Sequence, residues 1–272
     1  MKEKLSKKYF FLIIIIALFI FGIANVKQEK NVITTSSLTV ENLSSKKIEW
    51  GIKRNENHEQ PDLGSVNKRI IDERNGIAMG NKDSKKVYLT FDEGYEAGYT
   101  PKILEVLKEN EVKAAFFITA HFVNTQPDLV QRMIDEGHIV GNHTVNHKSM
   151  PSLSEDQIKS EVMTLHQTIY EKFGYEMKYM RPPKGEYSEK SVAYCNSLGY
   201  TTVMWSFAYD DWDENKQGRE EYGKKKILDN IHNGAVILLH GTSKDNSNIL
   251  DYCIKEIKKM GYEFASLDEF ER

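Results

Sequence analysis

The segment VYLTFDEGY, residues 87–95, indicates the fold of this chain more clearly than any other stretch. Residues 87–91 are mostly apolar and favour a buried strand, which is followed directly by the carboxylates Asp92 and Glu93. In α/β proteins, ligands bind at the carboxyl ends of parallel strands. The pair is therefore a candidate for chemistry, with one carboxylate as general base and the other as metal ligand. An acidic turn after a strand would give the same pattern.

Short apolar runs alternate with helical periodicities over the remainder of the chain. The apolar runs predict strands at residues 87–91, 114–119, 138–141, 179–181, 201–205, 235–239 and 263–265. The stretches between them predict helices at residues 101–110, 126–136, 154–173, 188–198, 222–232 and 246–260. Strands that alternate with helices form parallel β/α units, and about seven such units favour a barrel over an open sheet.

The amino terminus has the pattern of an export signal. Four lysines (Lys2, Lys4, Lys7 and Lys8) precede an apolar run over residues 9–24. This run is shorter than the roughly 20 residues that a full membrane span needs, so a cleaved signal peptide and an uncleaved signal-anchor both remain open. In either case we expect the remainder of the chain to be exported, as a secreted or membrane-anchored protein.

Composition shifts along the chain predict its organisation. A polar stretch rich in Ser, Thr, Asn and Lys has the composition of a flexible tether. A mixed segment with a possible short helix at residues 66–74 then precedes the first strand. The predicted parts are a signal segment at 1–26, a tether at 27–47, a pre-barrel segment at 48–86 and the barrel domain at 87–272.

Charge and cysteine content exclude two classes of protein. The formal net charge of −3 and the absence of a basic stripe argue against a nucleic-acid-binding protein. Cys195 and Cys253 are the only cysteines, which is too few for a disulfide scaffold. Both fall in predicted helices, so we interpret them as packing residues, with a disulfide between them as a lesser alternative.

Two further polar segments follow predicted strands. His143 and His147 lie four residues apart and can bring both imidazoles to one metal ion if the segment forms a helical turn. Thr144 stands where a zincin motif has Glu, so a general base must come from elsewhere. Arg181 ends another strand before two prolines, and its guanidinium can orient a carboxylate and keep it ionised. A surface histidine pair and a surface ion pair are the alternative interpretations.

Two more segments complete the pattern. Asp211 and Trp212 place a carboxylate beside an indole, a combination that suits a sugar-binding rim but also occurs in a polar loop with a packing Trp. A buried strand ends at His240, a natural position for a general acid. Each segment has a structural explanation by itself. Their joint occurrence at strand ends favours an active site.

These five segments resemble, in order, the five motifs of the polysaccharide deacetylases of carbohydrate esterase family four, which share the NodB homology domain. The resemblance covers residues 87–267. Within the family the chain is most similar to the delta-lactam-biosynthetic muramic acid de-N-acetylases, through residues 90–96, 205–208 and 238–246 and the region 50–80 ahead of the barrel. The resemblance implies a distorted (β/α) barrel, a divalent metal that is often zinc, and N-acetylated peptidoglycan as substrate.

The resemblance also implies a role for each matching residue. It implies Asp92 as catalytic base, His240 as catalytic acid, Arg181 as the residue that steadies the base, Asp211 as the acid that engages His240 or Arg181, Glu93, His143 and His147 as metal ligands, and Leu238 and Trp212 as the acetyl pocket and the sugar groove. Lys184 would contribute a backbone N–H to an oxyanion site, or its charge would bind an acidic substrate.

Two positions depart from the family pattern. Glu93 replaces the usual metal-binding Asp, and Lys184 stands where many members have an aromatic residue nearby. The expected reaction is removal of the acetyl group from N-acetylmuramic acid. The alternatives are deacetylation of N-acetylglucosamine in peptidoglycan or a chitin-like polymer, and a catalytically weakened module that binds wall glycan.

Overall fold

The computed structural model describes residue 40 and residues 42–272. The predicted signal segment, residues 1–26, and most of the predicted tether, residues 27–47, lie outside the described residues. Among the described residues, no helix has both the length and the apolar character that a membrane span requires. Residues 44–272 form one unit, which therefore includes the pre-barrel segment.

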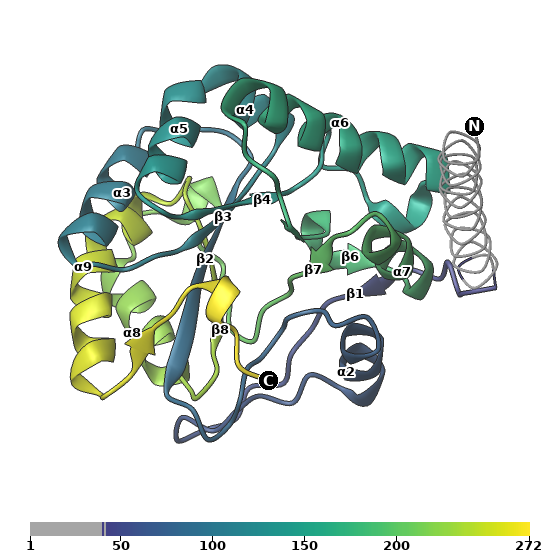
Figure 1. The fold of residues 1–272 in the computed structure, drawn as a ribbon. Coiled ribbons are helices and arrows are strands. Elements are labelled where there is room, and N and C mark those ends of the chain that lie inside the picture. Colours follow the sequence, from purple (N-terminus) through teal and green to yellow (C-terminus); the bar gives the residue numbers. More distant parts are fainter. Residues whose placement is uncertain (1–39, 41) are drawn as a thin grey trace, which may run out of the picture. The chain divides into compact units, whose positions relative to one another are not determined.

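A parallel sheet organises this unit (Figure 1). Its strands lie in the order β7-β5-β4-β3-β2-β8, and β9 pairs with the start of β2. All seven strands fall within or next to the predicted runs. They are β2 (Lys86–Glu93), β3 (Ala115–Ile118), β4 (Ile139–Asn142), β5 (Tyr179–Met180), β7 (Thr201–Thr202), β8 (Val236–His240) and β9 (Glu263–Phe264).

The two ends of the sheet approach each other beyond β7. There the amide N–H of Ser206 donates to the carbonyl of Val236 at 3.0 Å, and that of Leu238 donates to the carbonyl of Phe207 at 2.9 Å. These bonds join the segment after β7 to β8 and close the strands into an irregular ring. The predicted distorted (β/α) barrel is confirmed.

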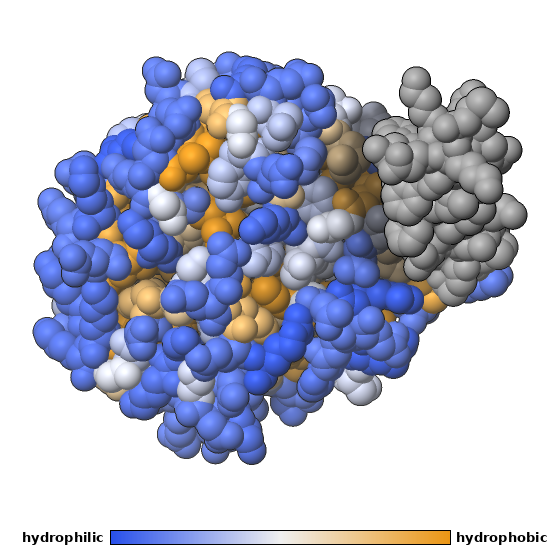
Figure 2. Space-filling model, viewed as in Figure 1, coloured by the Kyte–Doolittle hydropathy of each residue, from blue (hydrophilic) through white to orange (hydrophobic). Residues whose placement is uncertain are grey.

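Helices cover the outside of the barrel, and Figure 1 shows α3, α5 and α9 along its outer side. The helices are α2 (Ser65–Asp72), α3 (Thr100–Glu109), α4 (Ala120–Thr125), α5 (Pro127–Asp135), α6 (Glu155–Phe173), α7 (Glu189–Ser197), α8 (Glu220–Asn230) and α9 (Lys244–Lys259). Local signals set their ends: α6 begins at a capping box formed by Ser154 and Gln157 and ends at Gly174, which has a left-handed backbone. Figure 2 shows mostly hydrophilic residues on this face of the molecule, with smaller apolar patches between them.

Strand β2 separates two buried surfaces by its period of two. Val87, Leu89 and Phe91 pack into the large cluster that includes the helices, whereas Tyr88 packs into the cluster inside the barrel. The alternation therefore directs Asp92 toward the barrel interior and Glu93 toward the helix layer. This division of the two carboxylates determines how the site is built.

The pre-barrel segment packs against the loops that follow the strands. Strand β1 (Ile48–Glu49) pairs antiparallel with β6 (Glu186–Tyr187), and Trp50 donates from its indole N–H to the carbonyl of Trp205 at 2.9 Å. Helix α2 matches the predicted short helix within two residues at each end. The sequence pattern did not predict β1, β6 or α4, because each is shorter than two helical turns or one alternating strand.

Both cysteines are buried and free, Cys195 in α7 and Cys253 in α9. The prediction that they serve as packing residues is confirmed, and the disulfide alternative is not formed in this structure.

His138, at the start of β4, is a buried group whose burial links folding to pH. Its Nδ1 accepts the amide N–H of Ala114 at 3.2 Å, so the neutral ring carries its proton on Nε2, which has no hydrogen-bond partner. Burial, followed by the charge of Lys113, lowers the pKa of His138 to about 4.

We predict that His138 makes the protein less stable as the pH falls from neutrality. The unfolded chain takes up this proton below about pH 6.5 and the folded chain only near pH 4, so stability is lost between these values. At pH 4.5 the loss from this group is about 2.5 kcal/mol. Denaturant unfolding at pH 7 and pH 4.5 should show a smaller decrease for His138→Asn than for the wild type. Equal decreases would contradict the assignment.

Candidate active site

A pocket of about 1010 Å³ opens at the carboxyl ends of the parallel strands. It is lined by seven of the residues predicted from the sequence: Asp92, His143, His147, Lys184, Trp212, Leu238 and His240. Arg181 and Asp211 lie behind the pocket wall, where both are buried. The strand-end positions thus converge as the sequence predicted.

Asp92 and His240 are direct neighbours in this pocket. They are register partners on the adjacent parallel strands β2 and β8, so their side chains lie on the same face of the sheet. An acid and a base at adjacent positions are the two groups that proton transfer requires.

Arg181 holds Asp92 in its ionised form. The fully buried guanidinium donates to Asp92 Oδ1 at 2.7 Å and to Thr90 Oγ1 at 2.8 Å, and it also reaches the carbonyl of Val203 at 3.1 Å. Burial alone would raise the pKa of Asp92, but the charge of Arg181 and the hydrogen bond that it donates contribute to a pKa that is lowered overall. Asp92 is therefore a carboxylate at neutral pH and can accept a proton.

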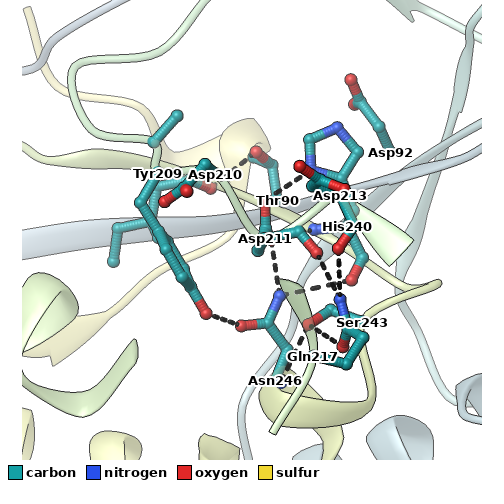
Figure 3. A network of polar contacts seen from close by, with 12 residues as sticks. Thr90, Asp92, Tyr209, Asp210, Asp211, Asp213, Gln217, His240, Ser243 and Asn246 are labelled. Atoms are coloured by element: carbon teal, nitrogen blue, oxygen red, sulfur yellow. Dashed lines mark hydrogen bonds and ion pairs between the residues drawn. The ribbon is translucent and has the colours of Figure 1, made fainter. Parts of the chain in front are cut away.

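A chain of hydrogen bonds holds His240 (Figure 3). The Asp211 carboxylate accepts the His240 ring at Nδ1 and the His240 backbone N–H, both at 2.8 Å. Asn246 donates to the same carboxylate at 2.6 Å, and Tyr209 donates to Asn246 at 2.5 Å. Burial would lower the pKa of His240, but Asp211 outweighs it and the pKa is raised. His240 thus keeps its proton over more of the neutral range, as a general acid needs.

His143 and His147 direct their Nε2 atoms at each other, 3.1 Å apart. The Nδ1 of His143 lies 2.9 Å from the carbonyl of Arg181, which can only accept, so the neutral ring carries its proton on Nδ1 and a lone pair on Nε2. Burial, the largest cause, lowers the pKa of both rings, that of His147 to about 4. Both histidines are therefore in the neutral form that binds metal ions.

The histidine pair fits a divalent cation. The lone pair on His143 Nε2 lies 3.4 Å from Asp92 Oδ2, and two acceptor atoms this close are stabilised by a positive charge between them. Of the three metal ligands that the family resemblance implies, His143 and His147 are the two that lie close together here.

Glu93 does not join the pair. Its carboxylate lies in the helix layer, where Thr100 Oγ1 donates to Oε1 at 3.3 Å and Gly241 leaves the space that the carboxylate fills. Burial, followed by repulsion from Glu96, raises the pKa of Glu93 well above its usual value. Within the described residues, no three His, Cys, Asp or Glu side chains form a ready set of metal ligands. The contacts give no support to Glu93 as the third ligand.

The remaining pocket wall combines apolar and charged groups. Leu238 is buried at its base, and Trp212 is 60% exposed at its rim. Lys184 has a left-handed backbone in the loop after the paired prolines. This wall is suited to a polar ligand with apolar faces, such as a sugar.

The sequence pattern missed several residues that shape the site. Thr90, which supports Arg181, lies two residues before Asp92 and could have been placed by the strand period. Tyr209 and Asn246 support Asp211, but they come from a loop and from a helix start, where no periodicity exists. Tyr95 and Glu214 also line the pocket and have no local signal.

Comparison with known proteins gives a consistent result. Residues 79–203 match the family described as polysaccharide deacetylase. The chain is 44% identical over 223 residues to the peptidoglycan-N-acetylmuramic acid deacetylase PdaA of Bacillus subtilis, which covers 82% of this chain and 85% of that protein. The structure of Bacillus subtilis PdaA, a family 4 carbohydrate esterase, matches with a TM-score of 0.82 and 42% identity over 84% of this chain and 98% of that one.

A second group of similar proteins has a different name. The peptidoglycan-N-acetylglucosamine deacetylase PgdA of Listeria monocytogenes is 33% identical over 207 residues, which is 75% of this chain and 43% of that longer protein.

We predict that Asp211→Asn lowers the pKa of His240, because the negative charge of the carboxylate, whose Oδ1 lies 2.8 Å from the ring, is lost. Asn246→Ala should lower it less, since the carboxylate remains. The measurement is titration of the His240 ring by NMR, with Asp251→Asn on the outer side of α9 as the matched control. An unchanged pKa in Asp211→Asn would show that the carboxylate does not hold the acid.

Proposed function

The chain belongs to the polysaccharide deacetylase family, and we propose that it hydrolyses N-acetyl groups of peptidoglycan, specifically those of N-acetylmuramic acid. The observation that carries this proposal is the pairing of Asp92 with His240 on neighbouring strands, each held by its own partner in the protonation state that amide hydrolysis requires.

Asp92 acts as the general base. Its ionised carboxylate removes a proton from the attacking water. Arg181, which is itself bonded to Thr90, keeps the Asp92 side chain in place during the transfer. Arg181 occupies Oδ1 of Asp92, so Oδ2 is the oxygen that faces His143. The backbone N–H of Lys184 would support the oxyanion.

His240 acts as the general acid. Asp211 fixes the proton on Nδ1, so the protonated ring presents Nε2–H to the pocket and can donate it to the departing sugar amine. Acetate and the free amine are the products. Leu238 at the pocket base would contact the acetyl methyl group.

A divalent cation, for which we propose zinc, would be held by His143 and His147. When bound, such a cation polarises the amide oxygen and lowers the pKa of a water. The protein's own contribution is the orientation of His143 through the carbonyl of Arg181 and the low proton affinity of both rings.

Lys184 supports N-acetylmuramic acid as the substrate. Lys184 lines the pocket, its charge acts on His147 and on Glu186, and it forms no ion pair within 4 Å among the described residues. N-acetylmuramic acid carries its lactyl carboxylate on the ring carbon next to the acetamide, so a cation beside the reacting group is suitably placed to bind it. Deacetylation would free the amine that closes on this carboxylate to form muramic delta-lactam.

Residues 1–26 support an exported location. We propose that they direct the chain across the membrane and leave the enzyme secreted or anchored on the side that faces the cell wall. The proposed substrate is found on that side of the membrane, so the export signal is consistent with the proposed reaction.

We predict that Asp92→Asn lowers acetate release from peptidoglycan by about 10²–10⁴-fold, because the base is lost while an oxygen still accepts the bond from Arg181. Acetate is measured together with circular dichroism and metal content, and Asp128→Asn on α5 is the matched control. Full turnover by Asp92→Asn would exclude the assigned base. A wild-type protein that binds glycan and releases no acetate would instead be a binding module.

We predict that Lys184→Gln reduces kcat/KM about tenfold on glycan with stem-free muramic acid and leaves activity on N-acetylglucosamine units unchanged. A charge-assisted hydrogen bond of this kind contributes roughly 1.5 kcal/mol. Lys159→Gln, on the outer face of α6, is the control. Mass spectrometry of digested glycan identifies the deacetylated sugar. New amines on glucosamine alone would favour the alternative substrate, which the similarity to PgdA supports.

A further inference from the structure

Tyr95 and Glu214 form a contact at the pocket that the catalytic assignment does not use. Tyr95 follows β2 and donates its hydroxyl proton to the Glu214 carboxylate. Both residues line the pocket, and Tyr95 is 40% exposed although its hydroxyl is held. Tyr95 therefore has a hydrogen-bonded hydroxyl and a solvent-exposed ring. A core tyrosine would have a buried ring, and an ordinary surface tyrosine would have no fixed hydroxyl.

Several polar contacts hold the loop that carries Glu214. Glu214 begins the short helix η3 (Glu214–Lys216), two residues after Trp212. Lys216 pairs with Asp213 at 3.2 Å and with Asp210 at 3.4 Å, and Gln217 donates to the carbonyls of Asp211 and Asp213 at 3.2 and 3.1 Å; Figure 3 shows part of this loop. The Tyr95 hydroxyl is thus bonded to a loop that has its own internal contacts, which restricts the positions of the Tyr95 ring.

The same pocket contains a second exposed aromatic ring, that of Trp212. Tyr95 and Trp212 are among the few large apolar side chains exposed in the described residues, and both lie on the pocket wall. Aromatic faces bind the apolar faces of sugar rings, and a carboxylate beside them accepts hydroxyl hydrogen bonds. Glu214 has one oxygen on Tyr95 and can offer the other.

We propose that Tyr95, Glu214 and Trp212 form a second sugar subsite, which binds a unit of the glycan next to the one that reacts. The inference rests on the proposed function for the identity of the polymer. It predicts that affinity rises with chain length, because a longer glycan would contact the Tyr95 ring as well as the reacting pair Asp92 and His240.

The test measures glycan binding by the full-length Asp92→Asn protein, which separates binding from turnover. Calorimetry, with competition for weak ligands, gives dissociation constants for N-acetylmuramic acid and for a peptidoglycan tetrasaccharide. The dissociation constant for N-acetylmuramic acid divided by that for the tetrasaccharide measures how much the longer glycan gains in affinity. We expect this ratio to fall about tenfold when Tyr95→Ala is added, and less with Tyr95→Phe, which keeps the ring. Tyr170→Ala, an exposed tyrosine on α6, is the matched control.

Each outcome decides between the subsite and a simple loop brace. If Tyr95→Ala weakens the binding of both ligands equally, the ratio of their dissociation constants is unchanged. The residue would then only hold the loops, and the subsite would be excluded. Glu214→Gln should weaken the tetrasaccharide alone. If the wild-type protein releases no acetate but this pattern of binding holds, the proposed reaction fails and the subsite stands.

Discussion

The buried guanidinium of Arg181 is the interaction on which the site depends. A fully buried charge is costly unless it is paired and its donors are satisfied, and here Asp92, Thr90 and the carbonyls of Val203 and Met204 meet that need while the ring of Phe117 lies 4.2 Å from the charge. These partners come from β2, β3 and the segment after β7. Meeting the demands of one side chain therefore fixes where three parts of the barrel lie relative to Asp92, and the carbonyl of Arg181 in turn orients His143.

The two reacting groups are tuned by opposite neighbours. Asp92 has a cation behind it, which favours its ionised form, whereas His240 has an anion behind it, which favours its protonated form. Because β2 and β8 are paired in register, these opposite environments lie side by side in one pocket. The fold places Asp92 and His240 next to each other, and the buried charges of Arg181 and Asp211 favour the protonation state of each.

The sequence pattern predicted the barrel and most of the pocket for a single reason: parallel strands end at the same edge. Asp92, His143, Arg181 and His240 lie at or next to the ends of strands, and the structure brings them together as that rule predicted. The rule does not extend to Glu93. Adjacent residues on a strand face opposite sides of the sheet, so Glu93 points away from Asp92 into the helix layer, and a motif match alone does not show this. Asn246 and Tyr209 reach Asp211 through tertiary contacts with no periodic signal, and β1, β6 and α4 are too short to show a period.

The absence of a side chain at Gly241 has a consequence for how this sequence can change. A Cβ at that position would lie 1.9 Å from Glu93 Oε1, so the glycine and the glutamate occupy one shared volume. The two positions, far apart in the chain, should therefore vary together among relatives, because a larger residue at 241 requires a shorter one at 93. Substitution at position 241 is thus limited by the space that the Glu93 side chain takes in the helix layer, independently of the chemistry on the other face of the strand.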